Sequence, residues 1–267
     1  MSYALVKPTP LVIWCNQRSG STHLSSLLAS HPEIACWREL LFVGEGSAQD
    51  DYFTRSKSKD LAAFLSSFFN YDWGPRGINL RDESSIDRVP GAVGFKLKYG
   101  QAWRYPTVLD CLFRYRDTLR VIHLVRTNLV ATLVSSLMLP TLFVKFGNSN
   151  VLVDAQLAGL DRSVWVDPRS VFSKLETLEA DLNMAKQQVR GLNTLEVVYE
   201  DLIDVPMITC KCILEFIGVD TGPILSSKYQ KILPRETSRA IKNINEIRAA
   251  LSGTRFSHLL ADGDNRE

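Results

Sequence analysis

The sequence predicts an α/β fold, in which a P-loop-like central parallel sheet is flanked by helices. Short apolar runs rich in strand-forming residues, such as 11–15 and 119–125, predict strands buried on both faces. Segments of helical periodicity separate these runs, a pattern typical of crossovers between parallel strands. A turn of small and polar residues, 16–20, joins the first strand directly to a helix. These three observations together predict the fold class.

The predicted elements alternate along the chain. The helix at 21–30 carries leucines at helical spacing, and it ends at His31 because a residue that precedes proline disfavours the helical conformation. The helix at 59–69 has one apolar face, and the helix at 207–217 is followed by Gly218, a residue typical of helix ends. The predicted strands are 11–15, 92–97, 119–125 and 194–199; the predicted helices are 21–30, 59–69, 107–115, 171–189, 207–217 and 239–251, with another entered near residue 128.

Composition and charge exclude several classes of protein. The 267 residues fit one large domain or two small ones, and 45% hydrophobic with 22% charged residues is typical of a globular chain. The net charge of +2 is too balanced for a protein that binds nucleic acid through its phosphates. We expect no membrane span and no secretory signal, because every long apolar window is interrupted by polar residues. The 5 cysteines, an odd number without regular spacing, favour a cytoplasmic location.

The loop after the first strand has the composition of an anion site. Small residues let backbone N–H groups converge on an anion, and the start of the following helix adds a favourable dipole. A guanidinium in this loop can donate two hydrogen bonds to phosphate or sulfate oxygens. The candidate donor-binding residues are Arg18, Ser19, Gly20, Ser21 and Thr22.

The loop lacks the parts of a kinase. Ser21 stands where the Walker A motif has lysine after its second glycine. Neither later strand ends in a clear Mg²⁺ ligand, since Arg126 follows one and Glu200 follows the other. The pair Cys210 and Cys212 lacks the spacing and the histidines of a zinc site. We therefore expect a nucleotide donor that is used without a metal.

A second candidate anion site follows the strand at 119–125. Arg126 lies at the carboxyl end of this strand, and Asn128 has the residue type of a helix cap. Ser135 lies two helical turns after Asn128 and therefore shares its face. Arg126 and Ser135 together could bind another phosphate of the same ligand, although a serine in a helix is more often a small packing residue.

These residues resemble the sulfotransferases that use 3′-phosphoadenosine 5′-phosphosulfate (PAPS). Residues 17–22 resemble the loop that binds the 5′-phosphosulfate, and residues 125–135 resemble the element that binds the 3′-phosphate. Within that family the sequence is most similar to bacterial carbohydrate sulfotransferases of the trehalose and nodulation-factor kind. Further similar segments are 31–33 with 39–41, 94–97, 199–202, 234–237 and 244–248. The resemblance implies one sulfotransferase domain over 1–267, with variable, substrate-side segments near 42–90 and 145–167.

The resemblance also implies a reaction and roles for particular residues. PAPS would be the sulfuryl donor, PAP the product and a carbohydrate or small alcohol the acceptor, with no metal. Sulfuryl transfer needs a base for the acceptor hydroxyl, and Glu39 is our first choice. Arg18 would stabilise charge on the leaving phosphate oxygen, and Lys96 would add a second cation at the transferred group. Trp37, next to Glu39, could stack on a sugar ring or on adenine, although a tryptophan is more often a packing residue of the core or a cleft.

Several alternatives stay open on the sequence. His123 is the alternative base, although a histidine in an apolar strand is more often a core residue, and His23 in the first helix could approach the donor. A kinase of the P-loop class, or a module that binds a nucleotide without turnover, would share much of this pattern. The acceptor and the oligomeric state leave no signal in the sequence.

Overall fold

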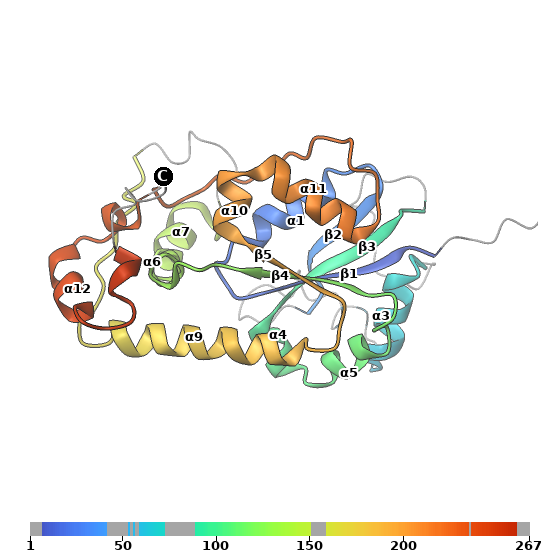
Figure 1. Cartoon of the computed structure of the whole chain (residues 1–267), viewed down its shortest axis with the longest axis horizontal. Helices are drawn as coiled ribbons and strands as arrows, with labels where there is room; N and C mark the ends of the chain where they lie inside the picture. The colour runs from blue at the N-terminus through green and yellow to red at the C-terminus, as the bar shows by residue number, and fades with distance from the viewer. Residues whose placement is uncertain are drawn as a thin grey trace, which may run out of the picture. The chain divides into compact units, whose positions relative to one another are not determined.

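The computed structural model describes residues 7–41, 53, 56, 59–72, 89–150, 159–234 and 236–260. Five parallel strands in these residues form one sheet with the order β2-β3-β1-β4-β5, flanked by helices. The predicted fold class is thereby confirmed (Figure 1). The strands are β1 (Thr9–Cys15), β2 (Ile34–Glu39), β3 (Ala92–Lys98), β4 (Arg120–Val125) and β5 (Thr194–Val198).

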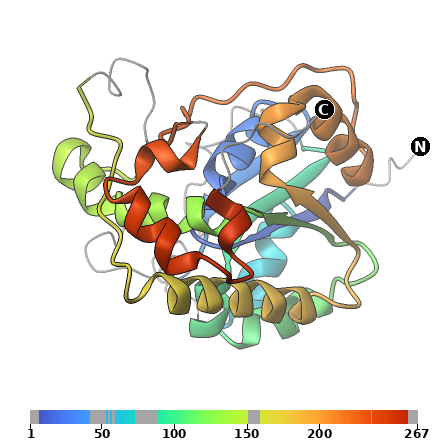
Figure 2. The same ribbon diagram turned by 60° about the vertical axis from the view of Figure 1, so that its left-hand side comes forward.

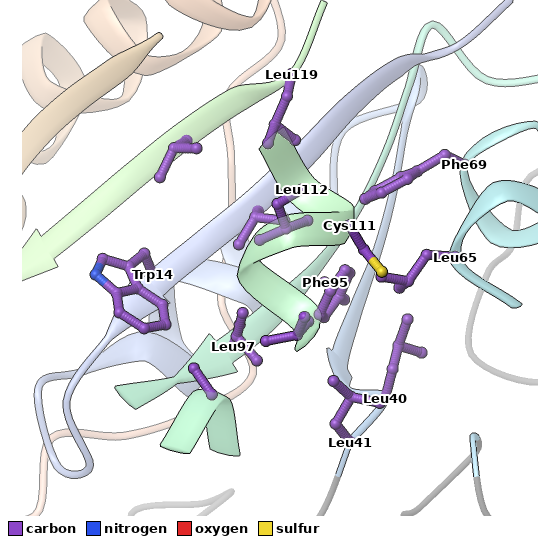
Figure 3. Close-up of a cluster of buried hydrophobic side chains, with 14 of the residues drawn as sticks. Trp14, Leu40, Leu41, Leu65, Phe69, Phe95, Leu97, Cys111, Leu112 and Leu119 are labelled. Atoms are coloured by element: carbon purple, nitrogen blue, oxygen red, sulfur yellow. The ribbon is translucent and has the colours of Figure 1, made fainter. Parts of the chain in front are cut away.

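Both faces of the sheet are buried, because apolar residues project from each face and helices pack against them. On one face, Leu11 and Ile13 of β1 pack with α1 (Ser21–Ala29) and α11 (Pro206–Ile217). In two views these helices lie on the same side of the sheet (Figure 1 and Figure 2). On the other face, Val12 and Trp14 pack with α3 (Leu61–Phe69), α5 (Thr107–Phe113) and residues from the end of α9. Figure 3 shows this second cluster, with Trp14, Phe95 and Leu112 on its side of the strands.

Contacts divide the chain into two compact units. The first comprises Met1–Val125 with Ala185–Ser227 and contains the whole sheet, and the second comprises Arg126–Met184 with Lys228–Glu267. A separate apolar cluster forms the core of the second unit. Its described elements are α6 (Leu129–Leu137), α7 (Leu139–Phe146), most of α9 (Val171–Gln188), η2 (Thr237–Ala240), α12 (Ile244–Leu251) and η3 (Ser257–Leu260). One domain over 1–267 stays a prediction.

The structure confirms the four predicted strands and most of the predicted helices, and it adds further elements. The additions in the first unit are β2, α4 (Tyr99–Arg104) and α10 (Tyr199–Asp204), and those in the second unit are α7, η2 and η3. The helix predicted over 239–251 is wrong in its first half. Ile241 is extended, with φ −119°, and it forms a β-bridge with Val164. Backbone hydrogen bonds on both sides of this bridge replace those of a helix, so the regular helix starts only at Ile244.

Most of the predicted variable segment 42–90, and residues 151–158 of the segment 145–167, lie outside the described residues, so the role of both segments as the substrate side stays a prediction. One helical stretch in the described part of the chain, Leu129–Phe146, has the length and composition of a membrane span. Residues Val130, Val134 and Leu142 of this stretch are buried in the core of the second unit. Because core helices of globular proteins pass the same test, the stretch is weak evidence for a membrane.

Candidate functional site

The loop after β1 turns sharply through two residues with a left-handed backbone. Arg18 has φ 63° and Gly20 has φ 88°. The Asn16 side chain accepts a hydrogen bond from the Gln17 N–H at 2.7 Å, and the Ser19 hydroxyl donates to the Asn16 carbonyl at 2.8 Å. A left-handed conformation costs a non-glycine residue about 1–2 kcal/mol, and such residues cluster at functional sites. The short-range hydrogen bonds hold this backbone, with Arg18 half-buried in it.

Gly20 is fixed in its place by a second element as well as by its backbone angle. A Cβ atom at this position would lie 2.2 Å from ring carbons of Tyr199. Tyr199 is the first residue of α10, directly after β5, and its ring is buried. The Tyr199 ring therefore packs directly against the loop backbone. Glycine suits residue 20 because it has no Cβ to overlap the ring and adopts a left-handed backbone without strain.

The first turn of α1 presents the positive end of a helix to the loop. Within the described residues, no side chain caps this helix at Gly20, and its first turn contains no acidic residue. The first N–H groups of a helix have no partner inside it, and the helix dipole favours an anion there. Ser19 and Ser21 are buried beside this turn. The loop and helix start thus have the geometry of a phosphate or sulfate site.

A buried lysine links this helix start to the neighbouring strands. Lys96 lies on β3, which pairs directly with β1, and only 3% of it is exposed. Its ammonium group donates to the Thr22 hydroxyl at 3.0 Å and lies 3.0 Å from Oε1 of Glu39. The lysine therefore contacts both the start of α1 and the predicted base. Both partners satisfy a charge that would otherwise be costly to bury.

Glu39 reaches Lys96 because β2 contains a bulge. Trp37 pairs with Phe95, and Glu39 pairs with Lys96, so Arg38 is the extra residue between them. Strict alternation would place Glu39 on the face of Trp37, opposite to Lys96. A bulge re-aims the side chain that follows it. The predicted base thus lies at the carboxyl end of an edge strand, on the same face as the loop.

Two further side chains hold the Glu39 carboxylate. The Lys98 ammonium lies 3.0 Å from Oε1, the same oxygen that contacts Lys96. The Gln101 amide donates to Oε2 at 2.7 Å, and its own oxygen accepts the backbone N–H of Lys98 at 2.8 Å. The Glu39 side chain is 12% exposed. Its two oxygens are thus oriented by two cations and one neutral donor.

The charges in this cluster shift each other's protonation. Burial acts to raise the pKa of Glu39, but the ion pairs with Lys96 and Lys98 outweigh it and lower the pKa below the ordinary value. Burial lowers the pKa of Lys96, against the attraction of Glu39. Burial raises the pKa of the adjacent Cys15 thiol. Glu39 is therefore ionised at neutral pH, and Cys15 is a neutral thiol.

The structure brings several predicted site residues together in the first unit. Arg18, Ser19, Gly20, Ser21 and Thr22 form the loop and helix start, and Thr22 is joined through Lys96 to Glu39. The catalytic and binding roles assigned to these residues stay predictions.

His123 is confirmed as a core histidine. It is 1% exposed, and its Nε2 lies 2.6 Å from the Tyr99 hydroxyl. Its Nδ1 lies 3.7 Å from a carboxylate oxygen of Glu196. Burial, only partly opposed by Glu196, lowers the pKa of His123 to about 4. His123 pairs with Trp14, whose side chain packs on the sheet face away from α1, so this histidine lies across the sheet from Lys96.

The predicted stacking role of Trp37 is wrong. Its side chain is fully buried, and its ring packs edge-on against Phe68 at 5.2 Å. Trp37 precedes the bulge, so it points to the opposite face from Lys96. It is a core residue of the first unit.

The residues predicted to bind the 3′-phosphate belong to the second unit. Asn128 is confirmed as the cap of α6, because its side chain accepts the Ala131 N–H at 2.8 Å. Ser135 is buried in the same helix, and Arg126 is half-buried directly after β4. Their binding of one ligand together with the loop stays a prediction.

Sequence reasoning missed three residues of this site. Lys98 had a usable signal, since it lies two positions after Lys96 on a strand and must share its face. Gln101 had none, because its contacts depend on how α4 starts after β3. Tyr199 lies in the segment 199–202 that resembles the family, but its contact with Gly20 depends on how α10 starts after β5. Among the described residues no group of three or more histidine, cysteine or carboxylate side chains could hold a metal ion.

No protein-family model matches the chain, and no curated protein sequence matches it. Solved structures of low sequence identity do match it. The sulfotransferase from Alicyclobacillus acidocaldarius is 13% identical with a TM-score of 0.47, and the match covers 95% of this chain and 96% of that one.

Two others are named as sulfotransferase domains. The sulfotransferase domain from the Synechococcus PCC 7002 olefin synthase is 18% identical with a TM-score of 0.45, covering 95% of this chain and 91% of that one. The sulfotransferase domain from the curacin biosynthetic pathway is 19% identical with a TM-score of 0.48, covering 89% and 85%. These are likenesses of the chain trace, and a function for this protein has to rest on the side chains of the site.

Proposed function

We propose that the protein is a PAPS-dependent sulfotransferase, which moves a sulfuryl group to a hydroxyl of a carbohydrate or related alcohol. The observation that carries this proposal is the run of contacts from Thr22 through Lys96 to Glu39. It joins an anion loop to a carboxylate across three adjacent strands. A transferase of this kind needs a site for an anionic leaving group and a base for the attacking alcohol.

The loop and α1 would hold the 5′-phosphosulfate of the donor. Backbone N–H groups, the Ser21 and Thr22 hydroxyls and the Arg18 guanidinium suit its oxygens in number and charge. Lys96, whose ammonium group contacts Thr22 in the first turn of α1, would contact the transferred sulfuryl group. Arg126 and Ser135 would bind the 3′-phosphate, which would distinguish PAPS from a donor without it.

The reaction exchanges one bond to sulfur for another. The acceptor oxygen forms a bond to sulfur as the bond between sulfur and the phosphate oxygen breaks, and the bonding electrons stay on that phosphate oxygen. The hydroxyl proton passes to a carboxylate oxygen of Glu39. Arg18 stabilises the negative charge that develops on the leaving oxygen, and Lys96 adds a second cation at the transferred group. The products are a sulfate ester and PAP, and no step requires a metal.

The competing kinase proposal is disfavoured by residue types. Ser21 occupies the position of the Walker A lysine, and the residues after β4 and β5 offer no clear Mg²⁺ site. A binding module without turnover would not need the ionised carboxylate that Lys96 and Lys98 hold at the loop.

A thermal-shift panel separates the proposed function from the kinase. Ligand that binds only the native state raises the melting temperature by mass action. We expect PAP without Mg²⁺ to stabilise the protein, and ATP with Mg²⁺ to have no effect. Stabilisation by ATP with Mg²⁺ alone would favour the kinase, and stabilisation by neither would contradict both.

Transfer itself is tested with labelled PAPS and a panel of free and lipid-linked sugars and simple alcohols. We expect the label to appear in a sulfate ester of at least one member. PAP stabilisation without labelled product from any member would favour the binding module. The cytoplasmic location stays a prediction.

A further inference from the structure

The Glu39 carboxylate occupies the position of an anion between two ammonium groups. Lys96 and Lys98 both lie 3.0 Å from the same oxygen, Oε1. We propose that the anionic group of the donor competes with Glu39 for these two lysines, so that donor binding releases Glu39 to act as the base. This inference rests on the proposed function, and it adds Lys98 as a donor ligand and Gln101 as a positioning residue.

Lys96 is already shared between the expected anion site at the start of α1 and the carboxylate of Glu39. The ammonium that contacts Glu39 also donates to Thr22 in the first turn of α1, where an anion would bind. At 3% exposure Lys96 has almost no access to water, so its partners must come from the protein or from a ligand. A phosphate or sulfate group at the loop would offer it several charged oxygens in place of one.

The charge of the cluster favours this exchange. Two ammonium groups surround one carboxylate, and the nearby Cys15 thiol is neutral because burial raises its pKa. The cluster therefore carries an excess positive charge that a donor anion would neutralise. Lys98 is 23% exposed and has a long, flexible side chain, so it can turn to the anion at little cost.

Gln101 would keep the released carboxylate in place. It holds Oε2, whereas the lysines contact Oε1, and its amide is itself fixed by the Lys98 backbone N–H. A backbone contact does not change when the Lys98 side chain turns. Gln101 therefore positions Glu39 both before and after the exchange, and Oε1 becomes available to the acceptor hydroxyl.

The exchange should change the number of protons that Glu39 binds. Lys96 and Lys98 on β3 are the charged groups that lower the pKa of Glu39, against burial. When they turn to the donor, burial and the added negative charge both raise that pKa. Donor binding at about pH 5, just above the ordinary pKa of a glutamate, should therefore take up protons on Glu39.

The test is calorimetry of PAP binding to the full chain in two buffers with different ionisation enthalpies, which yields the number of protons bound. Because phosphate groups themselves titrate near pH 6, the decisive quantity is the difference between wild type and Glu39→Gln. We expect wild type to take up more protons than the variant at about pH 5. At neutral pH we expect Glu39→Gln to bind PAP about tenfold more tightly, since the competing carboxylate is gone.

Two further variants keep the test specific. Lys98→Met should bind PAP more weakly and take up fewer protons than wild type, because Glu39 starts with one ion pair fewer. Glu196→Gln is the matched control: this glutamate also pairs with a lysine, Lys186, but on β5 away from the loop. It should bind PAP with unchanged affinity and proton uptake.

The outcomes separate this inference from the proposed function. Equal proton uptake and equal or weaker PAP affinity in Glu39→Gln would overturn the competition while leaving the sulfotransferase proposal intact. Absence of PAP binding to wild type would overturn both. Proton uptake that Glu196→Gln abolished as fully as Glu39→Gln would also refute the inference.

Discussion

At the scale of single residues, the site depends on cations held in unusual surroundings. Arg18 has a left-handed backbone, and Lys96 is buried beneath the first turn of a helix. Buried cations lose hydration that their partners must replace. The catalytic roles proposed for Arg18 and Lys96 stay predictions.

Replacing Arg18 with alanine should reduce sulfuryl transfer by at least about a hundredfold, because the leaving oxygen loses a charge-stabilising donor. The fold should persist, since this residue lies in a polar turn outside the core. The measurements are the rate with labelled PAPS and the melting temperature. Wild-type activity in this variant would remove the loop from the mechanism.

Replacing Glu39 with glutamine should lower turnover by about 10²- to 10⁴-fold, the usual contribution of a general base. The glutamine retains the size of the side chain but cannot accept the proton of the acceptor. In wild type the rate should fall as the pH decreases through the pKa of Glu39, because the protonated carboxyl is no base, and this acidic limb should vanish in the variant.

His123→Gln is the paired control for that experiment. His123 is buried on the opposite face of the sheet, so its replacement should leave the acidic limb in place. If His123→Gln abolished turnover while Glu39→Gln changed neither rate nor pH profile, the two roles would have to be exchanged.

At the scale of elements, the site is assembled from the segments at the carboxyl ends of the strands. α1 comes after β1, α10 comes after β5, and the bulge ends β2. In a parallel sheet these carboxyl ends share one edge, where ligands bind. The contact of Tyr199 with Gly20 shows this arrangement directly, because two segments far apart in sequence meet there.

Substituting Gly20 with alanine tests that contact. The left-handed backbone alone costs alanine about 1–2 kcal/mol, and the new methyl group must displace the Tyr199 ring. We expect denaturant unfolding to show a loss of stability of at least that size, together with loss of PAP binding. The double variant with Tyr199→Leu should recover part of the stability but not the backbone cost. Full stability in Gly20→Ala would contradict the observed packing.

Substituting Arg126 with alanine tests the element that comes after β4. A charge-assisted hydrogen bond to phosphate is worth roughly 1.5–3 kcal/mol, so PAP affinity should fall at least tenfold. Adenosine 5′-phosphosulfate lacks the 3′-phosphate and should bind both proteins alike. Equal weakening of the two nucleotides would assign Arg126 a structural role.

At the scale of the whole molecule, each unit has a core of its own. The core of the first unit includes a polar contact, between Tyr99 and His123. Because burial holds the pKa of His123 at about 4, this histidine is neutral in the native state. Its protonation therefore links the stability of the first unit to pH.

The direction of this pH dependence follows from the lowered pKa of His123 in the native state. The unfolded state binds a proton near pH 6.5, whereas the native state binds it only near pH 4. Stability is complete above pH 6.5 and declines as the pH falls towards 4, by about 2 kcal/mol at pH 5. Denaturant unfolding at pH 7.5 and pH 5 measures the decline, and His123→Gln should reduce it by that amount. An unchanged pH dependence in the variant would refute the assignment.

The sequence by itself determined the layered fold and the place of the loop. Buried parallel strands read as apolar runs, and the order of β1, loop and α1 is local, so hydrophobic pattern and turn residues suffice to predict them. Arg18 and Thr22 could be named for the same reason, whereas Glu39 was named from the resemblance to a family and from the need for a base. The short strand β2 was missed because Ala35, Arg38 and Glu39 give it no clear strand pattern.

Only the tertiary structure decided which side chains meet. The bulge at Arg38 turns Glu39 to the face of Lys96 and leaves Trp37 in the opposite core, and a single-residue change of register reverses such an outcome. Register is a property of two paired strands, not of either sequence segment. The contact of Tyr199 with Gly20 and the two lysines on one oxygen of Glu39 are likewise fixed by neighbours in space, because side-chain contacts between distant segments arise only when the sheet has formed.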